Sequence, residues 1–463
     1  MTFGLGQVMR LAVNVTLAAL LYEEVFALMA IVLAVMFGLA MFSDIGLKSN
    51  VVQHPRGDDP DFLNTAWTLQ VARGGLLFVL TLVVAWPLSR IYGANDPKAY
   101  ELLYLIPIAG LSALASGFES AKMMTAARHL RVKEVTRIEI ISGVIGAALM
   151  LLLAWFMRSV YALAIASVLT SVIQTVLSYW SLEGPRSRFR WDAESVRQIF
   201  SFGKWVFLST FFTFSAAQID RLAFGAMYPL AEVGVYSIAA SLAVMVPTLV
   251  GRLQHIVLFP WYSRMLSEGM PLAVAFDKTR PATLVASSFL CCLLVAGSGS
   301  FFDLAYDDRY AMGGMLLPVL AIGAWFNCLD SMYGSAFLAS GRPKWTAFSS
   351  GNKVAAFLVL LIPTSLLNLD IIYAALAIAG SELLRWVVSH VMGRRLGLRG
   401  LSWELGMMAF FLSVSGAGWW MLERSDLVSG LNPFWRLALL GVLGSAVFAP
   451  LVLRYILPQM RRR

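Results

Sequence analysis

The sequence predicts an all-α, polytopic membrane protein with about 14 transmembrane helices. Two observations predict this class: the composition, and a succession of apolar runs that are each long enough to cross a bilayer. The 463 residues are 59% hydrophobic and only 14% charged, with a mean hydropathy of +0.73, whereas soluble domains are roughly 25% charged. A chain with so few charges cannot cover its own surface with polar groups, but lipid accepts a mostly apolar exterior.

The apolar runs follow one another along the whole chain. A transmembrane helix needs about 20 predominantly apolar residues, and about 14 runs approach that length. Their approximate limits are 2–22, 26–47, 66–91, 101–126, 138–157, 160–181, 200–226, 234–260, 282–302, 311–340, 346–366, 370–392, 402–422 and 433–456.

Basic residues alternate between the connectors of these runs. The connectors after even-numbered runs, with the C-terminus, hold roughly 22 Lys and Arg residues, against about 5 in the other connectors. Because basic residues favour the cytoplasmic side, we expect both termini in the cytoplasm. The connectors are about 20 residues or shorter, which leaves no room for a soluble catalytic domain. We therefore do not expect an enzyme.

The net charge of +9 would also suit a protein that binds nucleic acid. The basic residues, however, lie in short connectors rather than on one amphipathic face, which argues against that class. Cys291, Cys292 and Cys328 lie in apolar runs, and the sequence has neither a metal-ligand spacing nor a nucleotide-binding motif. We expect no nucleic-acid partner, no metal and no cofactor.

Weak self-similarity indicates two related halves. A shift of about 208 residues pairs Glu24-Val25 with Glu232-Val233. Under this shift the seventh run begins about eight residues earlier than Met1 would, so the first helix is expected to be clipped at its start. We predict an N-terminal lobe at 1–181, a cytoplasmic linker at 182–199, a C-terminal lobe at 200–392, and two further helices with a basic tail at 393–463.

Two corresponding runs each carry a polar face. Gln7, Arg10 and Asn14 lie on one side of the first predicted helix, and Gln218 and Arg221 lie on one side of the seventh. A charge at the bilayer centre costs about 2.5–3.5 kcal/mol on insertion scales. We therefore expect both faces to line a water-filled cavity and to bind the substrate there.

Other charges lie within apolar runs. We assign a further group of basic residues to substrate binding: Arg73, Lys122, Arg252 and Lys353. A group of acidic residues provides candidates for coupling transport to an ion: Asp44, Glu119, Asp220 and Asp330.

Local alternatives exist for several of these charges. Glu119 and Lys122 are three residues apart and could neutralise each other, and Asp220 could pair with a charge across the lobe interface. Arg385 lies near the end of its run, where its side chain can reach the membrane surface, and Glu404 is interpreted as another end residue.

An interior supplied with guanidinium and ammonium groups suits an anionic cargo. Arginine stays charged and binds phosphate groups in a bidentate way. Pyrophosphate on a lipid carrier is one such cargo. Its glycan needs a wide, wet cavity, and its polyprenyl tail can stay in lipid at an opening between the two halves.

Short motifs in order along the chain resemble those of one known family. They are Phe42-Ser43-Asp44-Ile45-Gly46-Leu47, Phe62-Leu63-Asn64-Thr65-Ala66-Trp67, Asp220 followed by Glu232-Val233-Gly234-Val235-Tyr236-Ser237-Ile238-Ala239, and Tyr306-Asp307-Asp308-Arg309-Tyr310 with Ser340-Gly341-Arg342-Pro343. Over nearly the whole chain, their order and spacing resemble the polysaccharide transporter family of the MOP superfamily, the Wzx-type oligosaccharide flippases.

The resemblance implies a V-shaped transporter with two pseudo-symmetric six-helix lobes and two C-terminal helices. It implies that undecaprenyl-pyrophosphate-linked oligosaccharides cross the membrane by alternating access, for a surface polysaccharide such as lipopolysaccharide or exopolysaccharide. Membrane lipids, a polysaccharide polymerase and glycosyltransferases are the implied partners. Arg10 and Arg221 match the lumen-facing cations that contact the anionic substrate in that family.

Two other classes stay open at this point. A MATE-like multidrug or cation antiporter would carry mainly acidic residues at deep positions, and Asp220 and Asp330 keep that class open. A membrane glycosyltransferase or polymerase would need a catalytic cluster on a substantial loop. Asp307-Asp308 is the nearest candidate for such a cluster, and a solvated outer turn accounts for it better.

Overall fold

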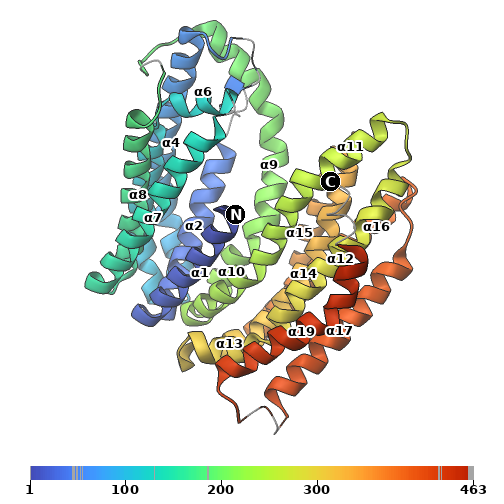
Figure 1. Ribbon diagram of the computed structural model, residues 1–463. Helices are drawn as coiled ribbons and strands as arrows, with labels where there is room; N and C mark the ends of the chain where they lie inside the picture. The colour runs from blue at the N-terminus through green and yellow to red at the C-terminus, as the bar shows by residue number, and fades with distance from the viewer. Residues whose placement is uncertain are drawn as a thin grey trace. The chain divides into compact units, whose positions relative to one another are not determined.

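The structure, a computed structural model, describes residues 2–43, 47, 51–52, 54, 56–129, 131–184, 187–425, 428 and 430–456. Regular structure in these residues is helical, and none of them lies in a β-strand (Figure 1). The expectation of an all-α protein is confirmed. Asp44 and the basic tail beyond residue 456 lie outside the described residues.

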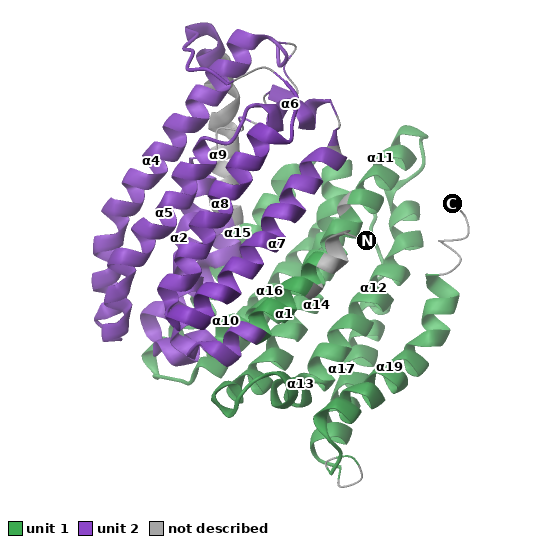
Figure 2. Ribbon diagram, turned by 60° about the vertical axis from the view of Figure 1, so that its left-hand side comes forward, with its two compact units in different colours: residues 1–15, 235–463 green, residues 16–234 purple. Residues whose placement is uncertain are grey.

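Two compact units make up the fold, and Figure 2 draws them in two colours. The N-terminal unit comprises residues 16–234, and the C-terminal unit comprises residues 1–15 and 235–463. α1 (Thr2–Leu20) begins in the C-terminal unit and ends in the N-terminal unit. The remaining helices of the N-terminal unit are α2 (Glu23–Phe42), α4 (Pro60–Gly93), η1 (Pro97–Glu101), α5 (Leu102–Gly117), α6 (Lys122–Arg128), α7 (Val132–Met157), α8 (Val160–Trp180) and α9 (Ala193–Met227).

The C-terminal unit begins within α10 and extends to the end of the chain. Its helices are α10 (Leu230–Leu253), η2 (Gln254–Leu258), α11 (Phe259–Ser267), α12 (Leu272–Ala296), α13 (Ser298–Ala305), η3 (Asp308–Tyr310), α14 (Met312–Ala339), α15 (Pro343–Leu366), α16 (Ile371–Arg394), α17 (Leu401–Glu423) and α19 (Pro433–Tyr455). Its apolar core packs around large buried side chains of α14, among them Trp325, Tyr333 and Phe337.

Every predicted run coincides with one helix or with two or three consecutive ones. Within the described residues, 12 helical segments are long and apolar enough to cross a membrane. The two other expected runs lie on α1, whose apolar part is Met9–Leu20, and on α9. The number of about 14 spans therefore agrees with the helices that the structure contains.

Large apolar side chains are exposed on both units. Phe156 of α7 is 75% exposed and Leu366 of α15 is 76% exposed, and many similar residues lie along the other helices. Soluble proteins rarely expose apolar surface of this extent. In contact with lipid hydrocarbon the same surface costs nothing, so the chain is a multi-pass membrane protein.

The contacts of α9 are with helices that precede it in the chain. It packs against α2 and α4 and belongs to the N-terminal unit. The compact units therefore do not follow the lobe limits expected at residues 182–199, and these limits stay a prediction.

Polar side chains determine where α9 begins. The Asp192 carboxylate accepts hydrogen bonds from the Ser195 backbone N–H, at 3.2 Å, and from the Ser195 hydroxyl, and these bonds lower the pKa of Asp192. A carboxylate that stays ionised at this position caps the helix and complements its dipole. α9 consequently starts at Ala193, before residue 200, where the run was expected to begin.

Candidate substrate pocket

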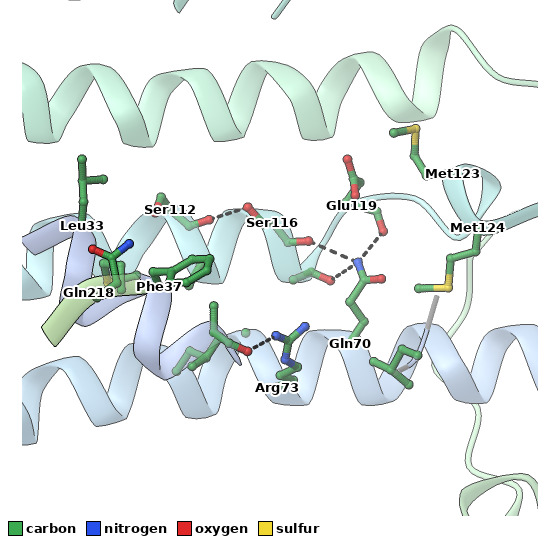
Figure 3. Close-up of a pocket in the computed structure, with 17 residues that line it drawn as sticks. Leu33, Phe37, Gln70, Arg73, Ser112, Ser116, Glu119, Met123, Met124 and Gln218 are labelled. Carbon is green, nitrogen blue, oxygen red and sulfur yellow. Dashed lines mark hydrogen bonds between the residues drawn. The ribbon is translucent and has the colours of Figure 1, made fainter. Parts of the chain in front are cut away.

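A pocket of about 690 Å³ lies inside the N-terminal unit, among α2, α4, α5, α6 and α9 (Figure 3). Its wall is mostly apolar and contains a few polar side chains. The lining residues are Leu33, Met36, Phe37, Ala40, Leu47, Gln70, Arg73, Gly74, Leu77, Ser112, Ala113, Ser116, Gly117, Glu119, Met123, Met124 and Gln218.

A glycine contact holds α4 against α5 beside the pocket. A Cβ atom on Gly74 would lie 2.9 Å from both the Cα of Gly117 and the carbonyl oxygen of Ala113. These are backbone atoms, so neither can move without shifting its helix. The close approach of the two helices brings the polar side chains of α4 next to the serines of α5.

The fourth predicted run is broken between α5 and α6. α5 ends at Gly117, and the side-chain amide of Gln70 on α4 donates hydrogen bonds to the carbonyl groups at this helix end. Its Nε2 lies 3.2 Å from the carbonyl oxygen of Ser116 and 3.1 Å from those of Gly117 and Glu119, while the Trp67 indole N–H donates to the Glu119 carbonyl at 3.0 Å. Unpaired carbonyls are costly inside a membrane, and broken helices in transporters commonly border binding sites.

Glu119 follows this break and is among the residues that line the pocket; its backbone carbonyl points toward Gln70, and its carboxylate points to the other side (Figure 3). Its Oε1 accepts a hydrogen bond of 3.0 Å from Nε2 of Gln174 on α8. The neighbouring Lys122 does not line the pocket. Its Nζ donates to the carbonyl oxygens of Tyr179 and Leu182, at 3.0 and 2.8 Å, where α8 ends.

Arg73 supplies a guanidinium group to the pocket wall. Its Nε donates to the Ser43 hydroxyl at 2.9 Å, and its Nη2 donates to the Ala40 carbonyl oxygen at 2.6 Å, in the last turn of α2. The side chain is half-buried. Carbonyls at a helix C-terminus stabilise a nearby cation, so α2 holds this charge beside the cavity.

α9 contributes Gln218, which was predicted as a substrate ligand and lines the pocket. Its Oε1 accepts a hydrogen bond of 3.3 Å from Nη1 of Arg221. Of the residues singled out from the sequence, the pocket thus brings together Arg73, Glu119 and Gln218. Gln70, Ser112 and Ser116 were missed because the search concentrated on charges. Their positions on one face of α4 or α5, at helical spacing from Arg73 or from each other, were the available signal.

The remaining predicted residues lie elsewhere. Arg10 is exposed on α1, where Gln7 and Asn14 are half-buried, and Arg252 is exposed near the end of α10. Asp220 is half-buried on α9, and Asp44 is outside the described residues. Their assignment to substrate or ion binding stays a prediction.

Asp330 and Lys353 belong to a charged cluster inside the C-terminal unit. The Lys353 ammonium lies 2.6 Å from Oε1 of Glu382, and Nε of Arg385 lies 2.8 Å from Oδ2 of Asp330. The Ser389 hydroxyl also donates to Asp330, at 2.6 Å. The interpretation of Arg385 as a side chain that reaches the membrane surface is wrong, since only 16% of it is exposed and it pairs with a buried acid.

Glu404 is fully buried although it lies in the first turn of α17. Its carboxylate accepts hydrogen bonds from the Tyr333 hydroxyl, at 2.6 Å, and from the Trp386 indole, at 3.1 Å. Arg280 lies 3.9 Å away. Glu404 is thus an end residue of its helix, as expected, but its carboxylate is a hydrogen-bonding centre of the core and does not reach the membrane surface.

The membrane-spanning helices, with a pocket that has charged and polar groups on its wall, define a membrane protein of the transporter type. A family model described as "Polysaccharide biosynthesis protein" matches residues 16–309, which is more than half of the chain. The chain belongs to this family, and the resemblance noted in the sequence is confirmed.

Individual relatives agree with this membership. The chain is 22% identical to the teichuronic acid biosynthesis protein TuaB of Bacillus subtilis (strain 168), over 80% of this chain and 74% of that protein. It is 20% identical to the lipopolysaccharide biosynthesis protein WzxC of Escherichia coli (strain K12), over 70% of this chain and 65% of that protein.

Solved structures share the fold. The lipid II flippase MurJ, in an inward closed conformation, superposes with a TM-score of 0.75 at 12% identity and 98% coverage of both chains. An inward-facing multidrug resistance transporter of the MATE family and MOP superfamily gives a TM-score of 0.58 at 14% identity, over 85% of this chain and 94% of that one. The chain thus shares its fold with these two membrane transport proteins.

Proposed function

We propose that this protein flips an undecaprenyl-pyrophosphate-linked oligosaccharide across the bacterial inner membrane for the assembly of a surface polysaccharide. Both termini lie in the cytoplasm, and one lobe rocks against the other to give alternating access. Family membership supports a role in polysaccharide biosynthesis. The single observation that carries the choice of cargo is the Arg73 guanidinium on the wall of an internal pocket.

Arg73 favours an anionic cargo over the cationic cargo of a multidrug antiporter. The planar donors of its guanidinium suit the oxygens of a diphosphate. The Ser43 hydroxyl and the Ala40 carbonyl orient the group. Glu119 in the same pocket is the feature that a cation antiporter would use.

The size of the pocket suits the polar head of such a lipid. Its volume of about 690 Å³ falls in the range of ligand sites, roughly 300–1,000 Å³. A diphosphate with the nearest sugar fits this space, while the polyprenyl tail stays in lipid. Gln218 and Arg221 extend the polar wall along α9. Gln7, Arg10 and Asn14 are also proposed to bind the substrate.

Replacement of Arg73 tests this function. In a strain without the gene, Arg73→Gln should leave lipid-linked oligosaccharide on the cytoplasmic face and reduce surface polysaccharide at least about tenfold, because charge-assisted hydrogen bonds contribute roughly 1.5–3 kcal/mol. Arg73→Lys should retain part of the activity. Arg90→Gln is the matched control, since Arg90 is exposed on the same helix. Normal export by an Arg73→Gln protein would contradict the assignment of the anion site.

A further inference from the structure

The serine hydroxyls of α5 offer the pocket only hydrogen-bond acceptors. The Ser112 hydroxyl donates to the Ala109 carbonyl at 2.5 Å, and the Ser116 hydroxyl donates to the Ser112 carbonyl at 2.8 Å. A hydroxyl has one hydrogen and two lone pairs. Because each serine hydroxyl donates its hydrogen to a carbonyl of its own helix, its oxygen can only accept a hydrogen bond from a ligand.

The side-chain amide of Gln70 likewise turns its oxygen, a hydrogen-bond acceptor, away from the break between α5 and α6. Three carbonyl oxygens lie within 3.2 Å of its Nε2, and an amide oxygen in that position would face them without a hydrogen. The orientation of the amide is therefore fixed, with the NH₂ group on the carbonyls and Oε1 turned away from them, as Figure 3 shows.

Glu119 adds a carboxylate beside these groups. Gln70, Ser112, Ser116 and Glu119 form what we call the acceptor wall, which follows α5 to its break before α6. The acceptor wall contains several oxygens and a negative charge, whereas Arg73 provides the cation of the same pocket. The two parts thus suit two different groups of one ligand.

We propose that the acceptor wall selects an uncharged sugar next to the diphosphate and rejects a sugar that carries a carboxylate. This inference rests on the proposed function. Sugar hydroxyls donate hydrogen bonds to the acceptors, and a site built for such donors strongly disfavours a ligand group that cannot donate. A ligand carboxylate at this position would lie near the Glu119 carboxylate in a medium of low dielectric constant, where like charges repel.

Two synthetic probes that differ at one carbon test the proposal. They are farnesyl diphosphate linked to glucose and farnesyl diphosphate linked to glucuronic acid, each titrated into the purified full-length protein in nanodiscs. The wild-type protein should bind the glucose probe at least about tenfold more tightly. Glu119→Gln should reduce this ratio of affinities to about threefold or less. Ser116→Ala should weaken binding of the glucose probe more than binding of the glucuronate probe.

The control is Glu134→Gln, because Glu134 is an exposed acid of α7 outside the pocket. This variant should keep the wild-type ratio. Equal binding of the two probes, tighter binding of the glucuronate probe, or an unchanged ratio in Glu119→Gln would overturn the inference and leave the anion site intact. Failure of the wild-type protein to bind either probe would overturn the proposed function as well.

Discussion

The ammonium group of Lys122 closes the end of α8. Helix ends leave carbonyl oxygens unpaired, and a cation near the C-terminus also complements the helix dipole. Lys122 donates to two such carbonyls, at 3.0 and 2.8 Å. Its position inside an apolar run suggested a substrate ligand, but its contacts are those of a structural residue.

Lys122→Met should therefore lower stability without changing recognition of the cargo. Loss of two charge-assisted hydrogen bonds should cost about 1–3 kcal/mol, which thermal unfolding of the purified protein would detect as a lower Tm. Binding of the farnesyl diphosphate probes should be unchanged. Lys133→Met, at an exposed position of α7, should affect neither quantity. A selective loss of probe affinity at wild-type Tm would instead assign Lys122 to the binding site.

At the scale of elements, the contact between α4 and α5 determines the width of the pocket. Gly74→Ala places a methyl group 2.9 Å from backbone atoms of α5, so the helices have to separate. Overpacking of this kind costs about 1–3 kcal/mol. We expect a lower Tm together with weaker binding of both probes by a similar factor, because Gln70 moves away from Ser116.

Gly75→Ala is the matched control for this effect. Gly75 is the next residue of α4, and a Cβ atom there meets nothing within 4 Å. This variant should bind both probes normally and should be as stable as the wild type or slightly more stable, since alanine favours helix. If both glycine variants behaved alike, the contact between the helices would not be what shapes the pocket.

The helices themselves were predictable, but their interruptions were not. Length and hydropathy located each run because the membrane imposes both. Hydropathy averaged over a run joins α5 to α6, because Gly117 and Glu119 alone do not lower the mean hydropathy of the run enough to reveal the break. The early start of α9 at Ala193 was missed for the opposite reason, because its first turns are polar and only the cap at Asp192 indicates a helix.

At the scale of the whole molecule, two buried acidic side chains of the C-terminal unit are paired with two basic ones. Asp330 and Glu382 are opposed by Lys353 and Arg385, and the acids are 2% and 5% exposed. Sequence inspection identified Asp330, Lys353 and Arg385 but could not pair them, because the partners come from α14, α15 and α16. Pairing depends on helix packing, which hydropathy does not report.

Breaking one of these pairs should destabilise the protein more than removing it. Arg385→Met leaves Asp330 buried without its partner 2.8 Å away, and loss of one member of a buried pair costs about 3–5 kcal/mol. Asp330→Asn in the same protein removes the charge that was left unpaired. The double variant should therefore recover most of the lost Tm, and Asp330→Asn alone should be less harmful than Arg385→Met because Ser389 can still bond to the amide.

The same variants separate a structural role of Asp330 from a role in ion coupling. If the pair only stabilises the fold, the double variant should recover export of polysaccharide together with its Tm. If Asp330 couples transport to an ion, the double variant should fold normally but remain inactive, because asparagine cannot take up and release a proton or neutralise a cation. Tm and surface polysaccharide measured on all four proteins distinguish these outcomes, and additive losses of Tm in the cycle would show that the two side chains do not act as a pair.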